Sequence, residues 1–98
     1  MPHTIFHPEA EAEMASAIGY YKTEAGSGTS VKFIARVEDA VATVKADPDA
    51  CPLIQGAYRR QRVFKFPYDV IFRVNADSLL IVAIAHHARE PHYWLDRT

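Results

Sequence analysis

The sequence has few of the features that mark secreted or membrane proteins. Its 98 residues include a single cysteine, Cys51, which excludes an internal disulfide and is typical of a reducing cytoplasm. The longest apolar run, residues 79–85, is too short to span a bilayer, and no basic stretch followed by an apolar segment opens the chain. We therefore expect a cytoplasmic protein that makes no use of a membrane.

The usual signatures of catalytic and cofactor sites are missing too. The chain contains no Gly-rich phosphate loop, no Ser/His/Asp pattern and no paired carboxylates. Its five histidines lack the Cys or carboxylate spacing of a zinc site, so we expect neither a metal nor a cofactor. Nothing near Cys51 in the sequence would activate its thiol, and we expect a small loop residue there.

Composition is that of an ordinary globular domain. Hydrophobic residues make up 49% and charged residues 23% of the chain, and its length suits one domain over residues 1–98. The net charge of -1 hides an asymmetry: seven acidic and four basic residues lie before position 49, and five acidic and seven basic residues follow. This asymmetry indicates a basic face, but it is too small to indicate nucleic-acid binding by itself.

Two amphipathic helices are predicted in the first half. Apolar residues recur at helical spacing over residues 8–24. This segment opens with a proline and acidic residues, which suit the first turn of a helix. Gly-Ser-Gly at 26–28 interrupts this pattern, and a second helix runs from a cap at position 29 or 30 to about Asp47. So short a connection predicts an antiparallel helical hairpin.

The periodicity changes to two residues in the second half, after a proline-containing loop at 47–52. A short edge strand at 4–6 and three further strands are predicted, at about 58–65, 68–74 and 79–85. The last is apolar on both faces, as central strands are. The order predicts an α+β fold, β-α-α-β-β-β, with the helical hairpin packed on one face of a small, mostly antiparallel sheet.

This order of elements, with the residues that fill it, resembles the RelE/ParE superfamily of toxins from bacterial type II toxin–antitoxin modules. The resemblance covers nearly the whole chain. Its motifs are Pro8-Glu9-Ala10, Tyr20-Tyr21, Arg59-Arg60, Phe66-Pro67-Tyr68-x-Val70-x-Phe72-Arg73-Val74, and Ala85-His86-x-x-Arg89-x-Pro91-x-Tyr93-Trp94.

The resemblance implies a growth-inhibiting toxin that a cognate antitoxin neutralises, and that meets DNA only indirectly, through the antitoxin. The superfamily's ParE branch poisons DNA gyrase, whereas its ribonuclease branch cleaves messenger RNA on the ribosome. In the ribonuclease branch an arginine of the middle strand belongs to the cleavage site, and Asp69 occupies that place here. A carboxylate would repel the anionic phosphorane of RNA cleavage, and no general base stands beside it in the sequence. We therefore favour the ParE-like branch, and binding over catalysis.

Two alternatives stay open. The first is ribosome-dependent RNA cleavage, in which Arg60, Arg62, Arg73 and Arg89 would stabilise charge and His86 or His87 would act as acid or base. The second is a degenerate, non-toxic interaction domain.

Candidate contacts to the target or the antitoxin are Arg59, Arg60, Arg62, Arg73, Arg89 and Tyr93. Strand alternation places the side chains of Arg60 and Arg62 on one sheet face and that of Arg59 on the other. The competing interpretation for these three is solvated charge on an edge strand.

Aromatic and histidine side chains near the C-terminus have competing interpretations. We expect His86 to hydrogen-bond a loop carbonyl and hold the exit of the chain from its strand, and Trp94 to cover the end of the sheet. For Tyr93 two interpretations stay open: burial, or contact with a nucleic-acid base or a partner protein. Tyr20 and Tyr21 are predicted to pack the helices.

Overall fold

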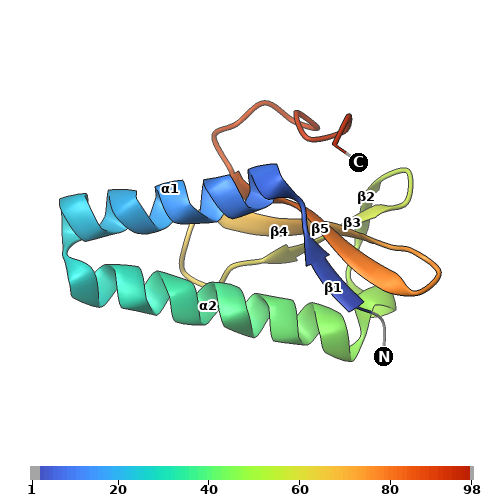
Figure 1. Ribbon diagram of the computed structural model, residues 1–98, viewed down its shortest axis with the longest axis horizontal. Helices are drawn as coiled ribbons and strands as arrows, with labels where there is room; N and C mark the ends of the chain where they lie inside the picture. Colours follow the sequence, from blue (N-terminus) through green and yellow to red (C-terminus); the bar gives the residue numbers. More distant parts are fainter. Residues whose placement is uncertain (1–2, 98) are drawn as a thin grey trace.

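Within residues 3–97, which the computed structural model describes, a helical hairpin covers one face of a five-stranded sheet (Figure 1). The elements, in chain order, are β1 (His3–Phe6), α1 (Pro8–Ala25), α2 (Ser27–Ala46), the 3₁₀ helix η1 (Pro48–Ala50), β2 (Leu53–Gln55), β3 (Tyr58–Arg62), β4 (Tyr68–Val74) and β5 (Ser78–His86). The predicted α+β architecture is confirmed.

The helical hairpin turns at a single residue. His7 caps α1 by accepting a hydrogen bond from the Glu9 backbone N–H on its Nδ1, at 3.1 Å. Gly26 has φ of 91°, a backbone conformation that glycine adopts without strain, and it joins α1 directly to α2. The second helix therefore begins at Ser27, not at the predicted position 29 or 30. Neither helix is long and apolar enough to cross a membrane within the described residues.

The sheet has the strand order β1-β5-β4-β3-β2, with β1 parallel to β5 and the other neighbours antiparallel. The prediction that the last strand lies inside the sheet and that β1 lies at its edge is confirmed. The three-residue strand β2 was not predicted, because Leu53–Gln55 is too short to show alternation. β2 pairs only with Tyr58 and Arg59 of β3, so the interpretation as an edge charge is wrong for Arg59. Arg60 and Arg62 lie beyond these pairs and are exposed, and for them it stays a prediction. β3 also ends at Arg62, three residues before the predicted end.

Each face of the sheet has its own apolar cluster. The helices cover one face through a core that includes Phe33, Val44, Phe72 and Ile81. The C-terminal tail, residues 87–97, covers part of the other face, where Trp94 is 3% exposed beside Tyr58, Ile71, Leu80 and Val82. The prediction of a buried Trp94 is confirmed.

The two adjacent tyrosines of α1 differ. Tyr21 packs among Phe33, Phe66 and Tyr68, with ring centroids 5.1–6.3 Å away, as predicted for a packing residue. Tyr20 instead has 59% of its surface exposed, so its predicted packing role is wrong. Neighbouring positions on a helix lie about 100° apart, and only one of the two can point at the sheet.

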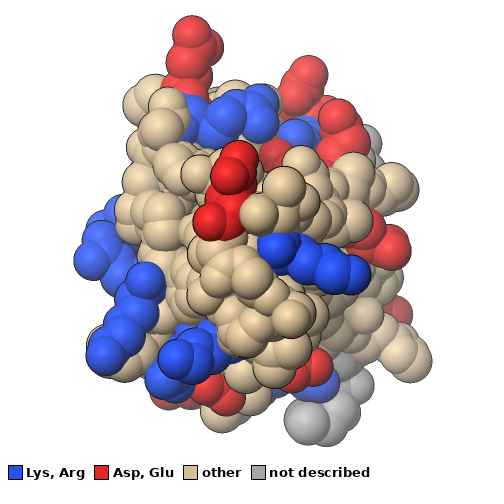
Figure 2. All heavy atoms as spheres, turned by 90° about the vertical axis from the view of Figure 1, so that its left-hand side faces the viewer, with Lys and Arg blue, Asp and Glu red and all other residues tan. Residues whose placement is uncertain are grey.

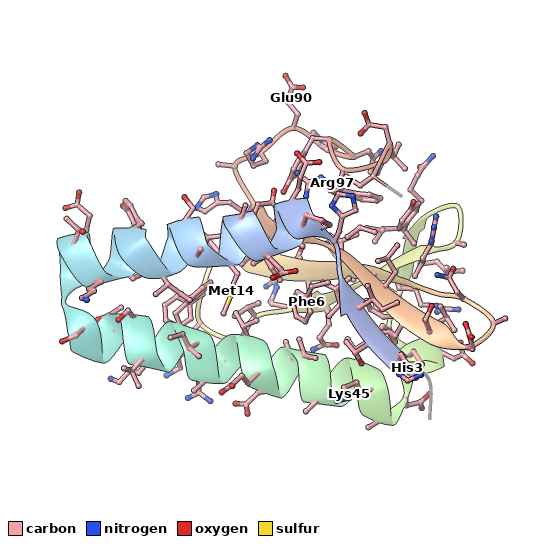
Figure 3. All side chains as sticks on the ribbon, viewed as in Figure 1. His3, Phe6, Met14, Lys45, Glu90 and Arg97 are labelled. Carbon is pink, nitrogen blue, oxygen red and sulfur yellow. The ribbon has the colours of Figure 1, made fainter. Side chains whose placement is uncertain are left out.

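The two helices diverge toward the β1 end and leave an apolar groove between them. Phe6 and Met14 point into this space (Figure 3), and Ile34, Val37 and Val41 of α2 contribute to its apolar lining. The groove has a volume of about 350 Å³.

Candidate functional site

A hollow of about 320 Å³ lies where β3, β4 and β5 meet the C-terminal tail, and we call it the basic hollow. Its charged and histidine lining residues are Arg60, Arg62, Asp69, His86, His87, Arg89, Glu90 and His92, and its apolar wall includes Ile71 and Trp94. The register of the strands brings its residues together: Arg62 of β3 lies opposite Asp69 of β4, which in turn lies opposite Ala85 of β5.

Asp69 is the buried centre of the basic hollow, with 8% of its surface exposed. Its Oδ1 lies 3.1 Å from Nε2 of His87, and its Oδ2 lies 3.8 Å from a guanidinium nitrogen of Arg60. A histidine, a residue type that can act as a general base, thus lies beside Asp69, where the sequence showed none. The reason is tertiary: His87 follows β5, 18 positions away in sequence, and antiparallel pairing brings it back onto β4.

Arg62 and Arg89 are the cations of the basic hollow that are most available to a partner. Arg62 is exposed at the end of β3. The Arg89 guanidinium lies 3.9 Å above the Tyr93 ring and 3.9 Å from the Glu13 carboxylate, and its side chain is 54% exposed. Viewed from the left-hand end of Figure 1, Lys and Arg side chains gather along the left and lower-left border (Figure 2).

Two of the predicted arginines lie outside the basic hollow. Arg59 points to the other sheet face, donates to the Cys51 carbonyl at 2.6 Å and pairs with Asp49 at 3.7 Å. Arg73 donates to the Tyr58 hydroxyl at 3.0 Å, and its Nε is buried without a partner in the described part of the chain. The structure thus groups Arg60, Arg62 and Arg89 with both histidines and separates them from Arg59 and Arg73.

His86 fixes the path of the chain where it leaves β5, but through a different hydrogen bond from the one expected. Its Nδ1 accepts a hydrogen bond from the Ala88 N–H at 2.9 Å, rather than donating to a carbonyl. Its ring stands edge-on to Tyr68, with centroids 4.9 Å apart. The Nδ1 acceptor leaves Nε2 as the ring nitrogen that carries hydrogen in the neutral form.

Cys51 is packed away beside the strands. It is buried, its sulfur lies 3.6 Å from the Gln61 amide oxygen, and burial raises the pKa of its thiol although Arg59 opposes that shift. A buried thiol with a raised pKa is a poor nucleophile, in agreement with the sequence. No three His, Cys, Asp or Glu side chains within residues 3–97 gather as metal ligands would.

A second polar cluster joins α1 to β5 and the tail, and sequence reasoning missed it. The carboxylate of Glu13 accepts hydrogen bonds from the Ile84 N–H at 3.1 Å, the Tyr93 hydroxyl at 2.6 Å and both terminal nitrogens of Arg97 at 2.9 and 3.1 Å. Arg97, which lies on the tail beside the start of α1 (Figure 3), also donates to the Val82 carbonyl at 3.0 Å. Glu13 looked like one of several solvated helix acids, and no local pattern distinguishes it.

Tyr93 gives this cluster a measurable pH dependence. Burial and the hydrogen bond to Glu13 raise the pKa of Tyr93 far above its ordinary value of 10.0. A raised folded-state pKa means that the stabilisation is fully present below the unfolded-state pKa and is lost as the pH rises through the folded-state value. Tyr93→Phe is expected to lower the free energy of unfolding by about 1–2 kcal/mol near pH 8, less toward pH 11.

Urea unfolding of both proteins at the two pH values measures this difference. Tyr20→Phe, on an exposed ring, is the matched control and is expected to match the unsubstituted protein at pH 8. A Tyr93→Phe effect that stays the same size or grows toward pH 11 would contradict the assignment.

Comparisons with known proteins agree with this architecture. Residues 4–91 match the family described as the ParE toxin of the type II toxin–antitoxin system parDE. A solved chain of the chromosomal ParDE toxin–antitoxin system from P. aeruginosa superposes with a TM-score of 0.77, at 17% sequence identity, over 88% of this chain and 96% of that one. At that identity the likeness shows the shared fold. A search of curated proteins gives no match. Because the family match spans most of the sequence, this chain belongs to the ParE toxin family of type II toxin–antitoxin systems.

Proposed function

We propose that the protein inhibits growth by binding an essential target, DNA gyrase by family resemblance, rather than by cutting RNA. The observation that carries this proposal is the buried carboxylate of Asp69 at the position where ribonuclease relatives need a cation. Its pairing with Arg60 engages one of the positive charges that could otherwise stabilise a phosphorane. The exposed guanidinium groups of Arg62 and Arg89 are suited to contact an acidic protein surface.

We further propose that a cognate antitoxin neutralises the protein by folding across the helical hairpin. The apolar groove between α1 and α2, with Phe6, Met14 and Val41, offers the unfilled hydrophobic surface that an amphipathic partner segment would cover. A small, acidic-tailed protein encoded by the neighbouring reading frame is the expected partner.

Ribosome-dependent RNA cleavage is the second candidate, and the pair formed by His87 and Asp69 favours it. A carboxylate 3.1 Å from the ring orients the imidazole and selects its tautomer, as a general acid or base requires. Arg60, Arg62 and Arg89 surround the pair, whereas Arg73 is held on Tyr58 and lies outside this arrangement.

Two readouts after induced expression separate these functions. Binding to gyrase predicts gyrase-linked DNA breaks and SOS induction, with ribosome-bound messages intact by primer extension. Cleaved messages with intact DNA would refute the binding mechanism. Normal growth, together with no neighbouring antitoxin frame, would indicate the non-toxic interaction domain instead.

Single substitutions locate the functional surface. Arg62→Ala is expected to weaken gyrase binding about tenfold or more, the effect of truncating an arginine that anchors an interface. Arg36→Ala, an exposed arginine of α2 beside Phe64, is the matched control and should bind as the unsubstituted toxin does. His87→Ala tests the alternative directly. If the toxin acts by binding gyrase, this variant should still cause gyrase-linked DNA breaks. If the toxin acts by cleaving messenger RNA, the variant should no longer cleave it.

A further inference from the structure

The turn between β3 and β4 holds an exposed aromatic ring on a well-packed support. Phe64 is 60% exposed, whereas Val63 before it is fully buried. Phe66, two residues later, packs on Tyr21 and Phe33, with ring centroids 5.1 and 5.2 Å away. The Val63 carbonyl accepts a hydrogen bond from the Phe66 N–H at 3.1 Å and closes the turn. Its packed neighbours thus fix the backbone of Phe64 while the ring stays in contact with solvent.

Two cations lie beside the Phe64 ring. The guanidinium carbon of Arg36, on α2, is 5.3 Å from the ring centroid, and Nζ of Lys65 is 5.5 Å from it. Both distances are near the outer limit of a cation–π contact, at about 6 Å. The two cations therefore leave much of the ring open to a further planar group.

The charge around the ring is mainly positive. Asp39 pairs with Arg36 at 3.5 Å, but the two side chains are 71% and 43% exposed, so water screens this pair. Lys32 is exposed one helical turn before Arg36, on the same face of α2. We call this set, formed by Phe64, Lys65, Arg36 and Lys32, the Phe64 patch. None of its residues lines the basic hollow or the apolar groove.

An open aromatic ring with cations beside it is suited to an unpaired nucleotide. The base stacks on the ring and the phosphates meet the cations, the arrangement by which proteins bind single strands. A nucleotide joins its base to its phosphates within a few ångströms, as the patch joins ring to cations. An acidic peptide would use the cations but leave the ring in water, and a duplex keeps its bases stacked on one another. The Phe64 ring therefore favours a single strand.

We propose that the Phe64 patch binds single-stranded DNA, with one base stacked on Phe64 and the adjoining phosphates paired with Arg36 and Lys65. The choice of DNA rests on the proposed function, because gyrase-linked breaks place DNA strand ends beside a bound toxin. In this arrangement the basic hollow contacts gyrase and the Phe64 patch contacts the broken strand. Such direct contact differs from the expectation that the toxin meets DNA only through the antitoxin.

Fluorescence anisotropy of the purified toxin tests the stacking contact. The probe is a fluorescein-labelled oligothymidylate of about ten nucleotides, long enough to cover one binding site. Phe64→Ala is expected to bind it about tenfold more weakly, the effect of removing one stacked base, and Phe64→Trp is expected to bind at least as tightly as the unsubstituted toxin. Tyr20→Ala removes a ring that is 59% exposed on α1 and is the matched control, which should bind normally. Circular dichroism checks that each variant is folded.

Salt dependence tests the phosphate contacts separately. Each cation that pairs with a phosphate of a single strand adds about 0.7 to the steepness with which the logarithm of the affinity falls with the logarithm of salt concentration. Lys65→Ala and Arg36→Ala are each expected to reduce this slope by about that amount. Lys45→Ala removes an exposed lysine near the other end of α2 and should leave the slope unchanged.

Binding to gyrase without DNA separates this inference from the proposed function. Phe64→Ala is expected to bind DNA-free gyrase as the unsubstituted toxin does. Weaker gyrase binding by this variant would assign the patch to the protein interface and overturn the inference.

The remaining failures are also distinguishable. Gyrase binding together with an oligothymidylate affinity that is absent, or unchanged in Phe64→Ala, would overturn the inference and leave the proposed function standing. Equal salt slopes for Lys65→Ala, Arg36→Ala and Lys45→Ala would overturn the phosphate contacts. Tighter binding of an oligouridylate of the same length would overturn DNA as the occupant. Binding of oligothymidylate through Phe64 without any binding of gyrase would overturn the proposed function and leave the patch as a DNA site.

Discussion

Glu13→Ala is expected to lower the free energy of unfolding by about 3–5 kcal/mol, the range for removing one partner of a buried ion pair. The substitution strips the Arg97 guanidinium, 9% exposed, of its bidentate partner, and it also leaves the Ile84 N–H and the Tyr93 hydroxyl without their acceptor. Because small domains are stable by only about 5–15 kcal/mol, this loss is a large part of the total. Urea unfolding followed by circular dichroism measures it.

Glu9→Ala is the matched control for this prediction. Glu9 lies one helical turn away and contacts the same Arg97 at 3.4 Å, but its side chain is mostly exposed. An exposed ion pair contributes about 0–1 kcal/mol, so the control should change stability little. Equal effects of the two substitutions, or a Glu13→Ala effect below about 1 kcal/mol, would contradict the assigned role of the Glu13 cluster.

Trp94→Ala is expected to lower the free energy of unfolding by a similar amount, about 3–5 kcal/mol, as for other buried aromatic residues. The indole is almost fully buried, 4.8 Å from the Tyr58 ring and against the apolar sheet face that the helices leave uncovered. Its loss should also loosen the tail, so that the amides of residues 93–97 exchange faster than those of the sheet.

Leu95→Ala controls for a general effect of shortening a tail side chain. Leu95 is 40% exposed beside Trp94, and its truncation should change stability by less than about 1 kcal/mol. If Trp94→Ala unfolded at the same urea concentration as Leu95→Ala, burial of Trp94 against this sheet face would contribute little to the stability of the protein.

The elements that the sequence predicted well are those with a strong local period. Both helices show apolar residues at helical spacing, and the two long strands β4 and β5 show alternation or a continuous apolar run. The elements it missed lack such a pattern. β2 has only three residues, and the start of α2 depends on the backbone of Gly26 alone.

The candidate site was predictable as a set of residue types, but not as an arrangement. Basic and histidine side chains near the ends of β3 and β5 were identified from the sequence, and strand alternation correctly placed Arg60 and Arg62 on one face. That His87 reaches Asp69, while Arg73 turns to Tyr58, follows from the register of three paired strands and the packing of the tail. Local patterns contain no information about either.

By itself the sequence determined the order of the helices and long strands, the helical hairpin on one face of the sheet, and the resemblance to a toxin family. These depend on residues within a few positions of one another, where periodicity and turn chemistry act. Only the tertiary structure decided that Glu13 meets Ile84, Tyr93 and Arg97, residues 71 to 84 positions away. It also decided that β1 pairs with only the first four residues of β5, Ser78 to Ile81. Contacts over such separations form only when the whole sheet, α1 and the tail pack together, so no short stretch of sequence encodes them.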